Sequence, residues 1–358
     1  MSPREPWLRE EFRLAGVPAM ISRAEQRYLF WLTRTRWRDE GHVVEIGPWL
    51  GGSTLCLAEG MAASEQTPRH RLHVFDNFQW RTFMARFAAL PLADGESFER
   101  YFRENTAAHR QRIVCHALNL PDEAIPGDSL AEAARGARAP ELDQFCWDSG
   151  EPIEILFVDG AKSWRGIRAL MRCVASSLLP GRSLLVCQDF KHWGSYWVPL
   201  LIARIRPKLE LVHIVRRGST ATFRLLQPLS VASFEELVDD VARLDTPEAL
   251  ADIEAMARWI ATTGDTLGAA HVRLGSVQLL SHQGHLSDAL ATFEELQASW
   301  PLRGSKGQLD DARRHLVARG LSPPPYRSWR RLLYAFGRSG DRRTPCLNST
   351  DSAPGKPR

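Results

Sequence analysis

The sequence comprises 358 residues, of which 44% are hydrophobic and 25% are charged, as is ordinary for globular proteins. Lys and Arg outnumber Asp and Glu by 46 to 42, and a formal net charge of +4 is too small to indicate a nucleic-acid partner. The N-terminal residues mix Arg with Glu and no later segment is long and apolar, so we expect neither a secretory signal nor an integral membrane segment.

The first elements along the chain predict a helix followed by a strand, a tight turn and a second helix. Apolar positions recur at helical spacing over residues 22–38, and this segment opens on Ser22, which suits a helix cap. HVVEIG is short, β-branched and ended by glycine, which predicts a strand, and GGSTLCLAEGMAA continues with helix-forming residues. We expect residues 1–40 to form a helical cap on a sheet.

Two more strands are predicted at RLHVFDNF, which ends in Asp76 and Asn77, and at residues 113–120. The aromatic-rich segment between them, residues 80–110, is longer than a plain crossover helix. We therefore expect it to be an insertion that forms part of a lid. Residues 127–150 combine Ala, Gly, Pro and charge, and we expect a variable helix and loop there.

The clearest strand is EPIEILFVDG, whose near-continuous apolar run is typical of a parallel strand buried on both faces and which ends in Asp159. A helix at residues 163–179 leads to a fifth strand, which ends in Asp189. A further helix and two apolar segments, joined by residues 216–218, follow. This alternation predicts an α/β fold, a doubly wound Rossmann-like sheet of seven mostly parallel strands, and the short final connection predicts an antiparallel last strand.

Beyond residue 228 the pattern changes to helices, and we expect a helical region over residues 229–336. One segment resembles a tetratricopeptide helix pair, although an ordinary helical hairpin packed on the main domain is the alternative, because stacked repeats need neighbours.

Residues 327–338 set aromatic side chains among arginines, which suits a membrane-surface helix or a terminal helix docked by its apolar face. The polar tail, residues 337–358, is expected to be disordered. In the segment that resembles a tetratricopeptide helix pair, residues 277–301, the typical positions are Leu280, Gly284, Ala289, Phe293, Leu296 and Pro301.

The six cysteines are scattered and include no CxxC pair. Several lie inside apolar runs, so we expect buried thiols and neither disulfides nor zinc ligands. This usage favours a reducing, cytoplasmic location.

The turn EIGPWLGGST, residues 45–54, is the candidate ligand-binding loop. Its glycines allow close approach to the backbone, amides at the following helix start can face an anionic group, and Ser53 or Thr54 can add a hydroxyl. A dinucleotide site would require GxGxxG, and here Trp49 takes the second glycine position, where it would obstruct a pyrophosphate. A tight structural turn is the alternative.

Four motifs occur in order, each at the end of a predicted strand: EIGPWLGGST, VFDNF, ILFVDGAKSW and LLPGRSLLVCQDF. Together they resemble the class I S-adenosylmethionine-dependent methyltransferases, in particular the branch of macrocin-type sugar O-methyltransferases. The resemblance implies that residues 41–228 bind S-adenosylmethionine, with the carboxylate of Asp76 accepting from the ribose hydroxyls. A turn cap is the alternative for Asp76. The candidate cofactor contacts are Glu45, Gly47, Pro48, Trp49, Gly51, Gly52, Ser53, Thr54, Asp76 and Asn77.

The resemblance also implies a metal site, because some family members hold a divalent ion with DGD or DGxH after strand four and an acidic pair after strand five. Asp159 and Asp189 match this pattern, and we expect them to be the ligands if Mg²⁺ is bound. Three positions depart from it: Ala161, Lys162 and Gln188.

Methyl transfer is an in-line displacement, so the protein mainly aligns the nucleophile and removes its proton. A metal at Asp159 and Asp189 would lower the pKa of a bound hydroxyl, and without it Lys162 or His192 would have to act as base. An ion pair that replaces the metal is the alternative for Lys162, and an ordinary loop position is the alternative for His192. Asp159, Lys162 and His192 are thus the candidate catalytic residues.

Aromatic residues near the second and fifth strand ends are candidates for a substrate wall, with core packing as the alternative. The leading hypothesis is an S-adenosylmethionine-dependent O-methyltransferase acting on a small-molecule or glycosyl hydroxyl. A catalytically silent protein that serves as a binding or scaffold subunit is the second hypothesis, and a nicotinamide-dependent oxidoreductase is disfavoured by Trp49. Homo-oligomerisation is left open. The aromatic candidates are Phe78, Trp80, Phe83, Trp193, Tyr196 and Trp197.

Overall fold

The computed structural model describes residues 5–323, apart from residues 67, 120–144, 148–149, 239 and 302–305. All the described residues belong to one unit, Met1–Pro323. The expectations for most of residues 127–150, for residues 327–338 and for the tail after residue 337 therefore fall outside the described residues. The domain boundaries at residues 41, 229 and 337 stay predictions.

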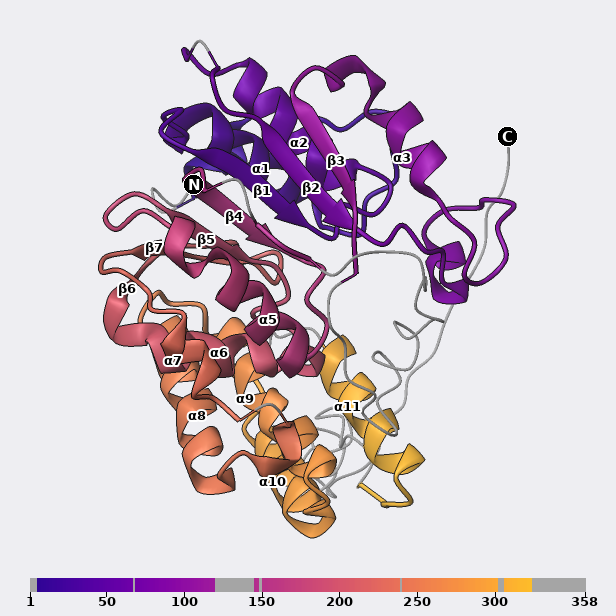
Figure 1. The fold of residues 1–358 in the computed structure, drawn as a ribbon. Coiled ribbons are helices and arrows are strands. Elements are labelled where there is room, and N and C mark those ends of the chain that lie inside the picture. Colours follow the sequence, from indigo (N-terminus) through magenta and orange to yellow (C-terminus); the bar gives the residue numbers. More distant parts are fainter. Residues whose placement is uncertain are drawn as a thin grey trace, which may run out of the picture. The chain divides into compact units, whose positions relative to one another are not determined.

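A seven-stranded sheet lies at the centre of the unit, with the order β3-β2-β1-β4-β5-β7-β6 (Figure 1). Six strands run in one direction and β7 runs antiparallel between β5 and β6. This arrangement confirms the predicted doubly wound sheet and its antiparallel last strand. The strands are β1 (His42–Ile46), β2 (Leu72–Asp76), β3 (Ile113–Ala117), β4 (Ile153–Val158), β5 (Leu184–Cys187), β6 (Leu209–Ile214) and β7 (Ala221–Leu225).

Helices cover both faces of the sheet, with α1, α2 and α3 on one face and α5 and α6 on the other (Figure 1). Strand β4 shows why both faces must be covered. Ile155 and Phe157 pack on the α1 and α2 side, and Leu156 and Val158 pack on the α5 and α6 side. Each face of the strand therefore removes apolar surface from water, as its near-continuous apolar run predicts. These helices are α1 (Arg23–Arg36), α2 (Gly52–Ala62), α3 (Glu99–Asn105), α5 (Trp164–Val174) and α6 (Trp197–Ile205).

The predicted first helix is confirmed as α1, and Ser22 caps it. The Ser22 hydroxyl accepts from the Glu25 amide at 3.3 Å, and the Glu25 carboxylate accepts from the Ser22 amide at 2.8 Å. These reciprocal bonds satisfy two amides that a helix start otherwise leaves without partners. Glu25 also accepts from Ser219 and Thr220, so the cap fastens α1 to the β6–β7 connection.

The chain after β7 is helical, as predicted, and it packs on the sheet domain. Helix α9 contacts α8, α10, α11 and the short turn η5 that follows β5. The predicted helix pair is formed by α9 and α10, and Gly284 turns between them with a φ of +82°. Among the described residues, no helix has both the length and the apolar character needed to cross a membrane. The helices are α7 (Ala232–Glu235), α8 (Thr246–Ala261), α9 (Thr266–His282), α10 (Leu286–Ala298) and α11 (Gly307–Ala318).

Short 3-10 turns complete the described secondary structure. The turn η5 is the most relevant to the site, because it lies in the loop that follows β5. The turns are η1 (Pro6–Arg9), η2 (Thr82–Arg86), η3 (Ala107–His109), η4 (Ala175–Ser177), η5 (Trp193–Ser195), η6 (Arg206–Lys208) and η7 (Val241–Arg243).

The expected burial of the cysteines holds only in part. Cys56 and Cys187 are buried and Cys115 and Cys173 are half-buried, but Cys146 is exposed. Cys146 follows buried Phe145 and precedes buried Trp147, so it points away from the core that those two rings enter.

Candidate active site at the carboxyl edge of the sheet

The candidate residues converge where the parallel strands β1, β2, β4 and β5 end. The backbone bonds Gly47 N to Phe75 O at 2.9 Å, Asp159 N to Ile46 O at 2.9 Å and Gln188 N to Val158 O at 3.1 Å link neighbouring strand ends. The loops that carry the predicted motifs therefore share one edge of the sheet, where ligands of such folds bind.

Backbone strain gathers at the same edge. Among the described residues, only four that are not glycine have a positive φ, and three of them are Trp49 (+46°), Phe78 (+53°) and Asp189 (+60°). These three residues follow β1, β2 and β5. Bulky residues rarely adopt this conformation unless their surroundings impose it, and such strain often occurs at functional sites.

The glycines of the turn are each required by a protein neighbour. A Cβ on Gly47, whose φ is +87°, would lie 2.6 Å from the amide nitrogen of Gly160 in the loop after β4. A Cβ on Gly51 would lie 2.7 Å from the methyl group of Thr106, and one on Gly52 would lie 2.6 Å from the Cβ of Ala19. The tight-turn alternative thus explains the glycines by itself, and their contact with a cofactor stays a prediction.

Glu45 is the first residue of the turn and the penultimate residue of β1, and it is fully buried. The Thr54 hydroxyl donates to its Oε2 at 2.6 Å, so this hydroxyl faces the protein interior. Burial raises the pKa of Glu45 to about 7, against the opposing effect of the Ser53 and Thr54 hydroxyls. Asp159 and Asp76 raise this pKa further, since their negative charges are close.

Asp76 forms the cap that the sequence leaves as its alternative role. Its Oδ1 accepts from the Phe78 amide at 2.8 Å, and the amide of Trp49 also bonds to its carboxylate. Asn77 caps in the same way, accepting from the Gln79 amide at 3.1 Å. Burial raises the pKa of Asp76 to about 6. A carboxylate offers about four acceptor positions, so these caps leave capacity for ribose hydroxyls.

Three polar atoms at this edge are buried and lack a hydrogen-bond partner among the described residues: Glu45 Oε1, Trp49 Nε1 and Gln188 Oε1. Two of them belong to the glycine turn, and the third belongs to the loop after β5. Most buried polar groups in folded proteins are paired. Unpaired atoms also occur away from this edge, as at Trp7 Nε1, so the three atoms here are compatible with a polar ligand or water and do not require one. The residues of the turn therefore fit a polar cofactor.

Lys162 joins the two candidate metal ligands. Its Nζ lies 2.9 Å from Asp159 Oδ1 and 2.8 Å from Asp189 Oδ2. Burial would lower the pKa of Lys162, but the charges of the two aspartates outweigh it and raise the pKa above its ordinary value. These contacts form the ion pair that the sequence offers as an alternative, and the role of Lys162 as a base stays a prediction.

The pKa values of the two aspartates shift in opposite directions, although both contact the same lysine. Burial raises the pKa of Asp159, whereas at Asp189 the opposing charge of Lys162 prevails and lowers the pKa. The Gln188 side chain also hydrogen-bonds Asp189 and helps to lower its pKa.

A divalent ion does not fit these residues. An ammonium group already occupies the space between the carboxylates, and Ala161 and Gln188 supply no further charge. Within the described part of the chain, no three His, Cys, Asp or Glu side chains form a group suited to a metal ion. The expectation of Mg²⁺ at Asp159 and Asp189 finds no support in this arrangement.

His192 lies beside Asp189 but is held by the backbone. Its amide donates to Asp189 O at 2.9 Å, and its Nδ1 accepts from the Gly194 amide at 3.1 Å. An Nδ1 that accepts requires the proton of a neutral ring to be on Nε2. The lone pair that a general base would use is thus already engaged.

The aromatic candidates are mostly core residues. Phe78 packs on Phe98 and Phe102, and Trp193 packs edge-on against His315 with ring centroids 5.6 Å apart. The Trp197 indole donates to Ala161 O at 3.1 Å. Of the six, only Phe83 is half-buried. Core packing, the alternative considered from the sequence, therefore describes the others.

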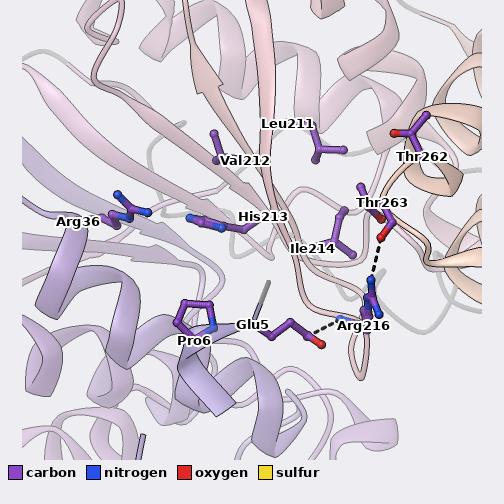
Figure 2. A pocket seen from close by; sticks show the side chains of 10 residues that line it. All are labelled: Glu5, Pro6, Arg36, Leu211, Val212, His213, Ile214, Arg216, Thr262 and Thr263. Atoms are coloured by element: carbon purple, nitrogen blue, oxygen red, sulfur yellow. Dashed lines mark hydrogen bonds between the residues drawn. The ribbon is translucent and has the colours of Figure 1, made fainter. Parts of the chain in front are cut away.

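A pocket of about 480 Å³ lies elsewhere, along the outer edge of β6. Figure 2 shows that its side chains come from the N-terminal segment, α1, β6 with the connection that follows it, and the α8–α9 connection. Burial and the neighbouring arginines lower the pKa of His213 in its wall to about 4. The pocket contains no candidate site residue, and sequence reasoning missed it because four distant segments build it. Its lining residues are Glu5, Pro6, Arg36, Leu211, Val212, His213, Ile214, Arg216, Thr262 and Thr263.

No protein-family model matches the sequence, and no curated protein is significantly similar to it. Some solved structures are similar to part of the chain. The O-methyltransferase from Bacillus cereus, in complex with SAH, has 14% identity and a TM-score of 0.35, and the alignment covers 57% of this chain and 82% of that chain. CalS11, a TDP-rhamnose 3'-O-methyltransferase in calicheamicin biosynthesis, has 17% identity and a TM-score of 0.38, covering 56% of this chain and 79% of its own. The O-methyltransferase NovP has 14% identity and a TM-score of 0.36, covering 57% and 80%.

Each of these three alignments covers a little over half of this chain.

Proposed function

We propose that this protein is an S-adenosylmethionine-dependent methyltransferase that methylates a hydroxyl of a small-molecule or glycosyl acceptor. The observation that carries the proposal is the set of buried polar atoms without described partners, Glu45 Oε1, Trp49 Nε1 and Gln188 Oε1, around a glycine turn at the carboxyl edge of the sheet. A ligand there must offer both donors and acceptors. S-adenosylmethionine has an ammonium and a carboxylate group, and it has no pyrophosphate for Trp49 to obstruct.

The cofactor would lie along the turn, with its ribose at Asp76. The amides that begin α2 would face its carboxylate, since the first amides of a helix have no partner within the helix. Asp76 would accept from the ribose hydroxyls while it keeps its bond to the Phe78 amide.

When bound, the cofactor would supply a methyl group on a sulfonium sulfur for transfer to the acceptor oxygen, and the neutral thioether is a good leaving group. The hydroxyl proton then needs an acceptor. We assign this role to Asp159, because burial raises its pKa and makes it a better base than Asp189. Lys162, protonated between the two carboxylates, would stabilise negative charge on the acceptor oxygen.

A catalytically silent protein is the second candidate. It is favoured by one observation, that both bases expected from the sequence are engaged, Lys162 with two carboxylates and His192 with the Gly194 amide. Such a protein would bind the cofactor and transfer nothing.

Calorimetry with S-adenosylmethionine, S-adenosylhomocysteine and NAD tests the proposal. We expect the two adenosyl compounds to bind with a stoichiometry of one and NAD not to bind. An absence of heat with both adenosyl compounds would exclude a methyltransferase. If they bind, incubation with labelled S-adenosylmethionine and pooled sugar and phenol acceptors distinguishes the active from the silent protein.

A further inference from the structure

Two carboxylates from neighbouring strands share one ammonium group at the edge of the sheet. Asp159 follows β4 and Asp189 follows β5, and Lys162 Nζ lies within 2.9 Å of an oxygen of each. The two aspartate side chains are 19% and 24% exposed and that of the lysine is 38% exposed, so the group faces the open edge of the sheet.

We propose that Lys162 is a built-in cation that takes the place of a divalent metal, and that its removal uncovers a latent metal site at Asp159 and Asp189. The inference concerns the ion alone and holds for any acceptor. It can be tested without a cofactor, so its failure is distinct from failure of the proposed methyltransferase function.

Charge explains why the lysine and a metal exclude each other. Two carboxylates close together repel, and a cation between them removes that repulsion. Once an ammonium group lies there, a divalent ion would have to approach a positive charge within a few ångströms, or else displace it. Lys162 hydrogen-bonds both oxygens and would have to lose both bonds.

The remaining ligand positions point the same way. An acid at residue 161 or 188 would add a third carboxylate, but the chain has Ala161 and Gln188 there. The Gln188 side chain hydrogen-bonds Asp189, which neutralises part of its charge without offering a strong ligand. One lysine balances two carboxylates to a net charge of −1, whereas a third carboxylate would leave −2.

The start of α5 fixes the backbone of Lys162. Ser163 is fully buried and its hydroxyl accepts from the Gly166 amide at 2.9 Å, and Trp164 is also fully buried and donates to Val238 O at 2.8 Å. The side chain of Lys162 therefore extends from a backbone that these contacts hold at the start of α5. A different side chain at residue 162 would extend from the same backbone position.

Measuring the binding of Mn²⁺ tests the inference. Free Mn²⁺ gives an electron-paramagnetic-resonance signal, which is lost when the ion binds to protein. The full-length wild-type protein should leave this signal unchanged at millimolar Mn²⁺. Lys162→His introduces a neutral third ligand between the aspartates, and we expect it to bind one Mn²⁺ about tenfold or more tightly than the wild type. Lys162→Ala, which removes the ammonium group and adds no ligand, should bind with an intermediate affinity, and Lys162→Arg, which keeps the charge, should not bind.

Two controls accompany these variants. Lys208→Ala removes an exposed amine that donates to Pro228 O, and it should behave as the wild type. Asp189→Asn in the Lys162→His background should abolish binding. One Mn²⁺ bound by the wild type and lost in Asp159→Asn would overturn the proposal, and so would a Lys162→His protein that keeps the wild-type melting temperature but binds no Mn²⁺.

Discussion

Lys191 and Asp265 form an ion pair, 2.6 Å from Nζ to Oδ2, and their side chains are only 2% and 6% exposed. Lys191 lies between Asp189 and His192 in the loop after β5, and Asp265 caps α9 through a 2.9 Å bond from the Gly268 amide. The lysine also donates to Val215 O at 2.9 Å. A candidate-site loop is thus tied to the helical region that follows the sheet.

Lys191→Ala should destabilise the protein by about 3–5 kcal/mol, because it leaves the Asp265 carboxylate buried without its cation. Urea unfolding followed by circular dichroism measures this loss. The matched control is Arg224→Ala, which breaks the half-exposed pair with Glu210 and should cost less than about 1 kcal/mol. Equal costs for the two variants would show that the buried pair does not hold the loop to α9.

Gly47→Ala should destabilise the protein more than Gly95→Ala. Both glycines have nearly the same φ, +87° and +85°, so alanine is strained at either position. Only at Gly47 would the new Cβ also meet a backbone, that of Gly160, at 2.6 Å, whereas nothing lies within 4 Å of Gly95. We expect about 1 kcal/mol for Gly95→Ala and at least twice that for Gly47→Ala. Thermal melting of the two variants isolates the steric contribution, and identical melting temperatures would mean that the loops after β1 and β4 separate freely.

The sheet could be predicted from the sequence because its signals are local. The β-branched run before Gly47 and the apolar run before Asp159 each predict a strand within one segment, and both strands form. The third strand ends at Ala117, three residues before its predicted end. The Leu118 amide still donates to Asp76 O of β2 at 3.0 Å, whereas Asn119 O accepts from the Phe145 amide at 2.8 Å.

The pairing of charges could not be predicted in the same way. Lys162 has Asp159 nearby in sequence, but Asp189 is 27 residues away, and Lys191 and Asp265 are 74 residues apart. Which carboxylate meets which amine depends on the packing of the loops, so the sequence could only offer the ion pair as an alternative. The aromatic substrate wall could not be predicted reliably for a related reason. The neighbours of Trp193 in sequence are the same whether its ring is buried in the core or faces a ligand.

Glu45→Gln should make the stability of the apo protein less dependent on pH between about 4.5 and 7. Burial raises the pKa of Glu45 from its ordinary 4.5 to about 7, so the folded state binds a proton that the unfolded state has lost in this range. The contribution of Glu45 to stability is complete below pH 4.5 and is lost as the pH rises through 7. Glutamine keeps an acceptor for the Thr54 hydroxyl and cannot ionise.

Urea unfolding at several pH values tests this expectation. The variant should gain on the wild type as the pH rises from 4.5 to 7, by an amount on the order of 3 kcal/mol at most. A difference between the two proteins that stays constant across this range would show that Glu45 is ionised in the fold.

Asp76→Asn should weaken binding of S-adenosylhomocysteine by about 10- to 100-fold, because hydrogen bonds from the ribose hydroxyls to a charged acceptor are replaced by bonds to a neutral amide. The chain offers a close control in Asp240, whose Oδ1 accepts from the Ala242 amide at 2.8 Å just as Asp76 Oδ1 accepts from the Phe78 amide at 2.8 Å. Asp240→Asn changes the same kind of turn cap far from the glycine turn and should leave the affinity unchanged. Calorimetry on both variants, with melting temperatures measured alongside, separates the loss of a ligand contact from the loss of a cap. If both variants lost stability equally and neither lost affinity, Asp76 would be a turn cap alone, and the ribose would have to bind elsewhere along the edge of the sheet.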